Sequence, residues 1–138
     1  MEEFDPFLAP PIPDGEYLVV YGGYATATMF AQKTPKLGLT FFIVDGIYGG
    51  YKLMRWYNVK QIKPDGFTAK SKTCALLMEY CKCFPDQELT RLDRIPLSRW
   101  EEGRYRVEVH TPEKNYEGEE TPKQLRQSVI KKILGRGE

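Results

Sequence analysis

Three runs of β-branched and aromatic residues, each bounded by glycine or proline, constrain the fold more than any other feature. The first run spans residues 16–30 and contains Gly22-Gly23, where we expect a bend or a bulge. The second spans residues 37–44 and the third spans residues 51–59. Turn residues separate the runs, so the pattern predicts three consecutive antiparallel strands.

Alternation within these runs assigns side chains to faces. Successive residues of a strand point to opposite faces of the sheet. In the third run, Lys52, Met54 and Trp56 therefore share one face, and Leu53 and Tyr57 share the other. In the second run, one face is apolar and is predicted to enter the core; its residues are Leu37, Leu39, Phe41 and Ile43.

The second half of the chain predicts a helix, further strands and a final helix. The first helix carries an amphipathic stripe and stops at Pro85; the stripe is Cys74, Leu77, Met78 and Cys81. Residues 95–97 and 105–110 favour strands. The last helix is predicted over residues 121–135, with Thr121 as N-cap and Gly135 as C-terminal stop.

This element order predicts a mainly β (α+β) fold. Three strands, a helix and two further strands are the order of the OB-fold, a small Greek-key barrel that binds oligonucleotides. We therefore expect one five-stranded OB-like barrel over residues 15–138, with a helix between strands three and four and the C-terminal helix. A five-stranded α+β sheet of another topology is the alternative.

Residues 1–14 are expected to form an acidic, proline-rich flexible arm. Four prolines disfavour a helix here, and residues 1–20 hold five acids and no base. At the start of this arm, acidic residues alternate with phenylalanines and proline. Such a segment would suit docking on replication proteins or on the protein's own basic groove. The residues concerned are Glu2, Glu3, Phe4, Asp5 and Phe7. An ordinary terminus without a role is the alternative.

Residues 21–72 have the opposite charge balance, with eight lysines and arginines against two aspartates. Binding single strands without sequence preference has two requirements: positively charged side chains along the path of the phosphates, and aromatic rings on which bases stack. Both residue types alternate in this region, although many rings of a small barrel belong to its core. The predicted nucleic-acid-binding residues are Tyr24, Lys33, Lys36, Tyr51, Lys52, Arg55, Trp56, Tyr57 and Lys60.

Several segments resemble OB-fold single-stranded DNA-binding proteins of phages and plasmids. The segments are DGEYLVVY (residues 14–21), LTFFIVDGIYGGYKL (39–53) and RWYNV (55–59), with GRYRVEV (103–109) and QSVI (127–130) in further support. The resemblance implies a role in replication, repair or transfer of a mobile element. Bacterial single-strand binders carry an acidic C-terminal tail, whereas residues 121–138 of this chain contain no acidic run.

Enzymatic and metal-binding functions find little support. The spacing of the three cysteines does not match a structural zinc site, and His110 beside Glu108 is the only histidine available as a general base. Asp45, Asp65 and Asp93 could build a nuclease site, but nothing in their spacing selects them. We therefore expect no catalytic residues, no metal and no cofactor.

Partners and location follow from the same features. The expected ligand is single-stranded DNA, with RNA left open, and exposed strand edges make a homodimer an option. The alternative function is a protein-interaction or regulatory module that binds an acidic protein. DNA and an acidic protein are both anionic, so the basic residues suit either ligand. No apolar run approaches the roughly 20 residues of a membrane span, and the odd cysteine count favours a reducing cytoplasm.

Overall fold

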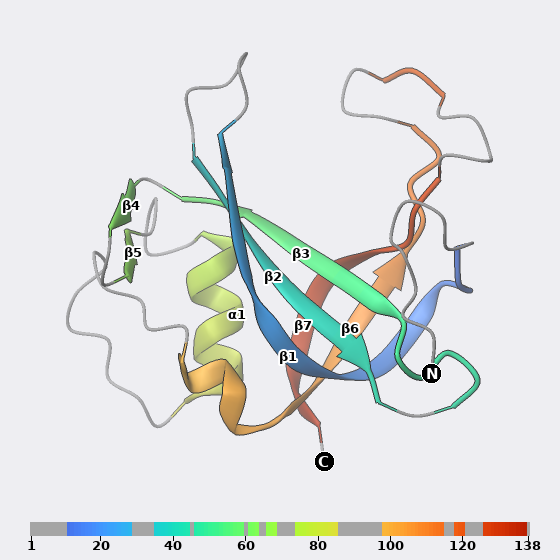
Figure 1. The fold of residues 1–138 in the computed structure, drawn as a ribbon, viewed down its shortest axis with the longest axis horizontal. Coiled ribbons are helices and arrows are strands. Elements are labelled where there is room, and N and C mark those ends of the chain that lie inside the picture. The colour runs from blue at the N-terminus through green and yellow to red at the C-terminus, as the bar shows by residue number, and fades with distance from the viewer. Residues whose placement is uncertain are drawn as a thin grey trace.

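A computed structural model describes residues 11–28, 35–44, 46–59, 61–63, 66–68, 74–85, 98–114, 118–120 and 126–137. These residues confirm a mainly β structure with one α-helix (Figure 1). Five strands form an open antiparallel sheet in the order β3-β2-β1-β6-β7. Their bounds are β1 (Gly15–Thr28), β2 (Pro35–Ile43), β3 (Lys52–Asn58), β6 (Arg104–His110) and β7 (Val129–Gly137).

The remaining elements lie between β3 and β6 in the chain. They are the hairpin of β4 (Gln61–Lys63) and β5 (Gly66–Thr68), the helix α1 (Ala75–Cys83) and the 3-10 helix η1 (Ser98–Glu102). Among the described elements, no helix has the length and apolar content to cross a bilayer. The strand expected at residues 95–97 lies outside the described residues.

The three consecutive N-terminal strands are confirmed, and so is the irregularity in the first. The β1–β2 register shifts between Tyr21 and Gly23, and Gly23 has a φ of 122°, which glycine adopts at little cost. The predicted apolar face of β2 is buried as expected, with Leu37, Leu39 and Phe41 fully enclosed.

The predicted C-terminal helix is wrong, because residues 129–137 form the strand β7. The register between β6 and β7 shifts twice, so Lys131 and Leu134 are extra residues on β7. An extra residue between Ile130 and Ile133 turns both side chains inward although they are three positions apart. The bulge at Lys131 therefore gives two inward-facing residues of a strand the three-residue spacing that is also typical of one face of a helix. Residues 121–125 lie outside the described residues.

The predicted helix exists, and only part of its expected stripe is buried: Leu77 is in the core and Cys74 packs against it. Met78 and Cys81 are exposed, while Leu76, Tyr80 and Cys83 are buried. This second stripe also has helical spacing and contains the largest side chain of the helix. Tyr80 joins an aromatic cluster around the fully buried Trp100, with ring centroids 5.0–6.2 Å apart; the other members are Phe41, Phe84 and Tyr105.

The packed domain begins before residue 15. Ile12 is buried in the core, and its backbone N–H donates to Ser128 Oγ over 2.9 Å. Residues 1–10 of the expected arm lie outside the described residues.

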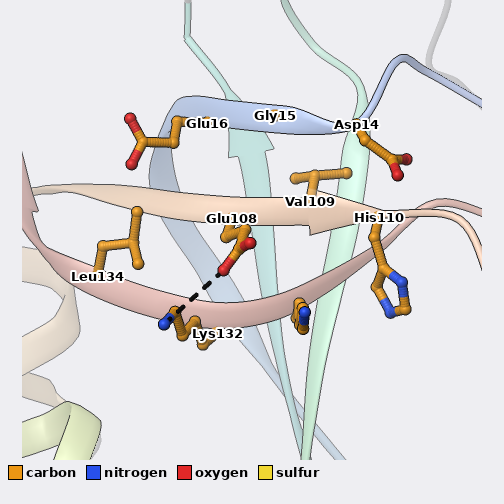
Figure 2. A pocket seen from close by; sticks show the side chains of 9 residues that line it. Asp14, Gly15, Glu16, Glu108, Val109, His110, Lys132 and Leu134 are labelled. Carbon is orange, nitrogen blue, oxygen red and sulfur yellow. Dashed lines mark ion pairs between the residues drawn. The ribbon is translucent and has the colours of Figure 1, made fainter.

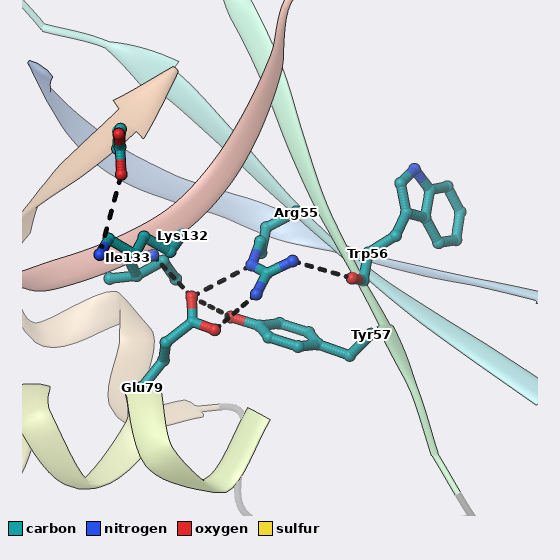
Figure 3. A network of polar contacts seen from close by, with 7 residues as sticks. Arg55, Trp56, Tyr57, Glu79, Lys132 and Ile133 are labelled. Carbon is teal, nitrogen blue, oxygen red and sulfur yellow. Dashed lines mark hydrogen bonds and ion pairs between the residues drawn. The ribbon is translucent and has the colours of Figure 1, made fainter. Parts of the chain in front are cut away.

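A buried carboxylate connects α1 with both edges of the open sheet. Glu79 is 5% exposed and accepts two hydrogen bonds from Arg55 on β3, Nε to Oε1 at 3.1 Å and Nη2 to Oε2 at 2.6 Å. Its Oε1 also accepts from the Tyr57 hydroxyl at 3.2 Å and from the backbone N–H of Ile133 on β7 at 2.6 Å (Figure 3). Glu79 therefore joins the edge strands β3 and β7, between which the described residues form no ladder.

We expect Glu79→Ala to lower the free energy of unfolding by about 3–5 kcal/mol, because it leaves Arg55 buried without a counter-charge. Urea denaturation measures this loss. Glu108→Gln is the matched control, because its ion pair with Lys132 spans 3.9 Å and is partly exposed; the control should cost less than about 1 kcal/mol. Equal losses in the two variants would contradict the structural role of Glu79.

The cysteines should differ in reactivity with a thiol-alkylating reagent. Burial, followed by the charge of Glu79, raises the pKa of Cys83 to about 12, whereas Cys81 is exposed. The thiolate is the reacting species, so at pH 8 Cys81 should be modified well before Cys83. Peptide mass spectrometry after timed alkylation checks the order, and preferential modification of Cys83 would contradict its burial.

Candidate nucleic-acid interface

A groove of about 250 Å³ lies between β3 and the segment that leads into β7. Alternation along β3 turns Lys52, Met54 and Trp56 away from the core, and these three side chains line one wall. The sequence-based prediction that Lys52 and Trp56 share a face is therefore confirmed. The other wall is formed by Gln127, Ser128 and Val129, and Tyr51 completes the lining.

Trp56 is the exposed aromatic residue of the groove. Its side chain is 40% exposed and projects away from the Glu79 network (Figure 3). Trp56 stands opposite Gly38 on β2, and a Cβ built on Gly38 would come within 2.8 Å of Trp56 Cζ3 and 2.9 Å of Met54 Cε. The missing side chain of Gly38 therefore makes room for the indole against the sheet, while part of the ring stays accessible.

Two lysines flank this ring on the same face of the β2–β3 ladder. Lys52 stands opposite Phe42 at one end, and Lys36 stands opposite Asn58 at the other. Both lysines are partly exposed. Positive charge on either side of an exposed ring is the combination that a single-stranded nucleic acid requires.

The same face continues across the sheet beyond the predicted residues. Phe42 lies against Gly22, where an added Cβ would meet its ring, and one register row joins Lys52, Phe42, Val20 and Arg104. Arg104 is exposed on β6. Met54 follows from the alternation of β3 and could have been predicted, whereas Gln127 was hidden by the incorrect C-terminal helix.

Tyr51 and Tyr57 do not offer the predicted stacking faces, because each is only 4% exposed. Burial, followed by the charge of Glu79, raises the pKa of Tyr57 well above its usual value, so its hydroxyl stays protonated and donates to Glu79. For Tyr51, burial raises the pKa and a hydrogen bond with Ser128 partly opposes the shift. Both rings stabilise β3 from the inside.

Arg55 is also not placed for the predicted phosphate contact. Its side chain is mostly buried, lies over the Tyr57 ring at 4.5 Å and forms the bidentate pair with Glu79. Burial by itself would lower the pKa of Arg55, but the bonds to Glu79 outweigh this effect and raise it. Its charge is therefore neutralised within the protein.

Tyr24 is exposed, but it lies away from the groove. Its side chain is 58% exposed, and it stands opposite Leu39, which faces the core. The bulge in β1 produces this orientation, so Tyr24 and Trp56 lie on opposite faces of the sheet. Lys33 and Lys60, the remaining predicted contacts, lie outside the described residues.

A second depression lies over β1, β6 and β7 and carries charges of both signs (Figure 2). Asp14, Glu16 and Glu108 supply carboxylates, and Glu108 pairs with Lys132 at 3.9 Å. His110 also lines it, but within the described part of the chain no three such side chains are arranged to hold a metal ion. Its mixed charge makes it less suited to a polyanion than the groove beside β3.

Gly38→Ala should displace the Trp56 ring, because a Cβ 2.8 Å from Cζ3 forces it to move. We expect a shift in the tryptophan emission maximum, since Trp56 is partly exposed whereas Trp100 is buried. Gly22→Ala is the matched control on the same face, because its Cβ would meet Phe42 instead. An unchanged spectrum for Gly38→Ala, or an equal shift in the control, would contradict this placement of the indole.

Comparisons of this chain with protein-family profiles, with characterised proteins and with solved structures find no match.

Proposed function

We propose that the protein binds single-stranded DNA, without catalysis, through the groove between β3 and residues 127–129. The observation that carries this proposal is Trp56, a partly exposed indole held against Gly38 and flanked by Lys36 and Lys52. A base stacked on such a ring gains about 1–3 kcal/mol, and the lysines attract the neighbouring phosphates. Every base has a flat face, so binding of this kind tolerates different sequences.

The strand order supports an OB-like Greek-key barrel as the framework of this function. β6 returns after α1 to lie beside β1, which gives the spatial order 4-1-2-3 of a Greek key for β6, β1, β2 and β3. β7 extends the sheet on the far side, and Glu79 links it to β3. OB-folds are partly open barrels that bind oligonucleotides beside their second and third strands and adjoining loops. The groove beside β3 supports the same assignment.

The sequence resemblance suggests a setting for this activity. Proteins of phages and plasmids that bind single strands act in replication, repair or transfer of the element, and we extend that role to this chain as part of the proposal. Binding of an acidic protein partner by the same lysines is the alternative, and the experiment below separates the two.

Binding of oligo-dT should quench the fluorescence of Trp56, and Trp56→Ala should weaken the affinity about 5- to 150-fold. Anisotropy of a labelled oligonucleotide measures the affinity when the indole is absent. Met78→Ala, which shortens an exposed apolar side chain on α1, is the matched control and should bind normally. Full affinity in a folded Trp56→Ala protein would disprove stacking in the groove.

The lysine contribution is measured in the same titrations. Lys52→Ala should reduce the slope of log affinity against log salt by about 0.7 for the lost phosphate contact. Lys82→Ala, on the exposed side of α1, should leave the slope unchanged. If the unmodified protein fails to bind any oligonucleotide at low salt, the single-strand proposal is wrong and an acidic protein becomes the preferred ligand.

A further inference from the structure

The wall of the groove that faces β3 carries an amide that has no hydrogen-bond partner among the described residues. Gln127 is partly exposed and lines the groove with Lys52, Met54 and Trp56. None of the hydrogen bonds among the described residues engages its side chain, although its neighbours Arg126 and Ser128 are both bonded. An amide in this position can donate and accept hydrogen bonds to a ligand in the groove.

The position of this amide is fixed by the residue that follows it. Ser128 is buried, and its hydroxyl accepts from the backbone N–H of Ile12 at 2.9 Å and shares a hydrogen bond with Thr111 Oγ1 at 2.9 Å. These bonds attach the segment to the start of the domain and to the end of β6. The Gln127 backbone therefore has little freedom to withdraw from the groove.

Stacking and hydrogen bonding use different parts of a base. A ring such as Trp56 contacts the flat face of a base and leaves its edge free, and the edge is where bases differ. Cytosine presents an amino donor where thymine presents a carbonyl acceptor. A glutamine amide can turn by half a rotation and offer the complementary group to either one.

We infer that Gln127 hydrogen-bonds to the edge of the base stacked on Trp56, and that its reversible amide makes this contact tolerant of base identity. The inference rests on the proposed function and adds a residue that determines specificity. A carboxylate at the same position accepts only, so it should favour the amino group of cytosine over the carbonyl oxygen of thymine.

The test compares the dissociation constants for oligo-dT and oligo-dC of equal length. In Gln127→Glu, the ratio of the dT dissociation constant to the dC dissociation constant should rise about fivefold or more. With thymine, a carboxylate oxygen would face the carbonyl oxygen of the base, so two acceptors stand where the amide formed a hydrogen bond. The added charge repels both oligonucleotides equally and cancels in the ratio. Gln127→Ala should weaken binding of both oligonucleotides with little change in the ratio.

Asn58→Asp is the matched control. It adds the same charge to β3 two residues beyond Trp56, but Asn58 does not line the groove that Gln127 lines; it lies in the depression that Trp56 borders with Arg55 and Cys74, so the ratio should stay constant. Thermal unfolding verifies that each variant is folded. An unchanged ratio in Gln127→Glu, in a protein that still loses affinity on Trp56→Ala, overturns the inference and leaves the proposed function intact. Absence of oligonucleotide binding by the unmodified protein overturns both.

Discussion

The hydrogen bonds of one buried carboxylate hold the two edges of the sheet together. Glu79 receives the Arg55 guanidinium and the Tyr57 hydroxyl from β3, and the Ile133 backbone N–H from β7. A carboxylate is costly to bury unless its oxygens are well bonded, and four donors provide that compensation here. Without Glu79, Arg55 would remain as an unpaired charge and the edge N–H of Ile133 would lose its acceptor. The helix thus connects strands that the sheet itself leaves apart.

This internal network also determines the outer surface of β3. Side chains alternate along a strand, so fixing Arg55 and Tyr57 on the inner face fixes the direction of Met54 and Trp56 on the outer face. The groove therefore depends on contacts that lie on the opposite side of the same strand. The second wall is fixed independently, through the bonds of Ser128 to Ile12 and Thr111. A groove between two such walls is preorganised, which limits the entropy lost when a ligand binds.

Much of the fold could be predicted from local patterns, and part of the site followed from them. Alternation identified the first three strands and placed Lys52 with Trp56, and the same alternation placed Tyr57 with the core residue Leu53. The roles of Arg55 and Tyr57 were nevertheless predicted incorrectly, because their residue types suit a phosphate or a base as well as they suit a carboxylate. Their partner Glu79 lies more than twenty residues away, and no local pattern connects it with β3.

The sequence by itself determined the period-two strands, the helix before Pro85 and the basic, aromatic character of residues 21–72, because these depend on neighbours along the chain. Only the tertiary structure decided the conformation of residues 129–137. There, the bulge at Lys131 brings Ile130 and Ile133 to the same side of a strand, and pairing with β6 selects the strand over the helix that the same spacing predicts. The groove was decided in the same way, since Gln127 and Trp56 line the same groove only when β7 is built as a strand and its leading segment is placed beside β3.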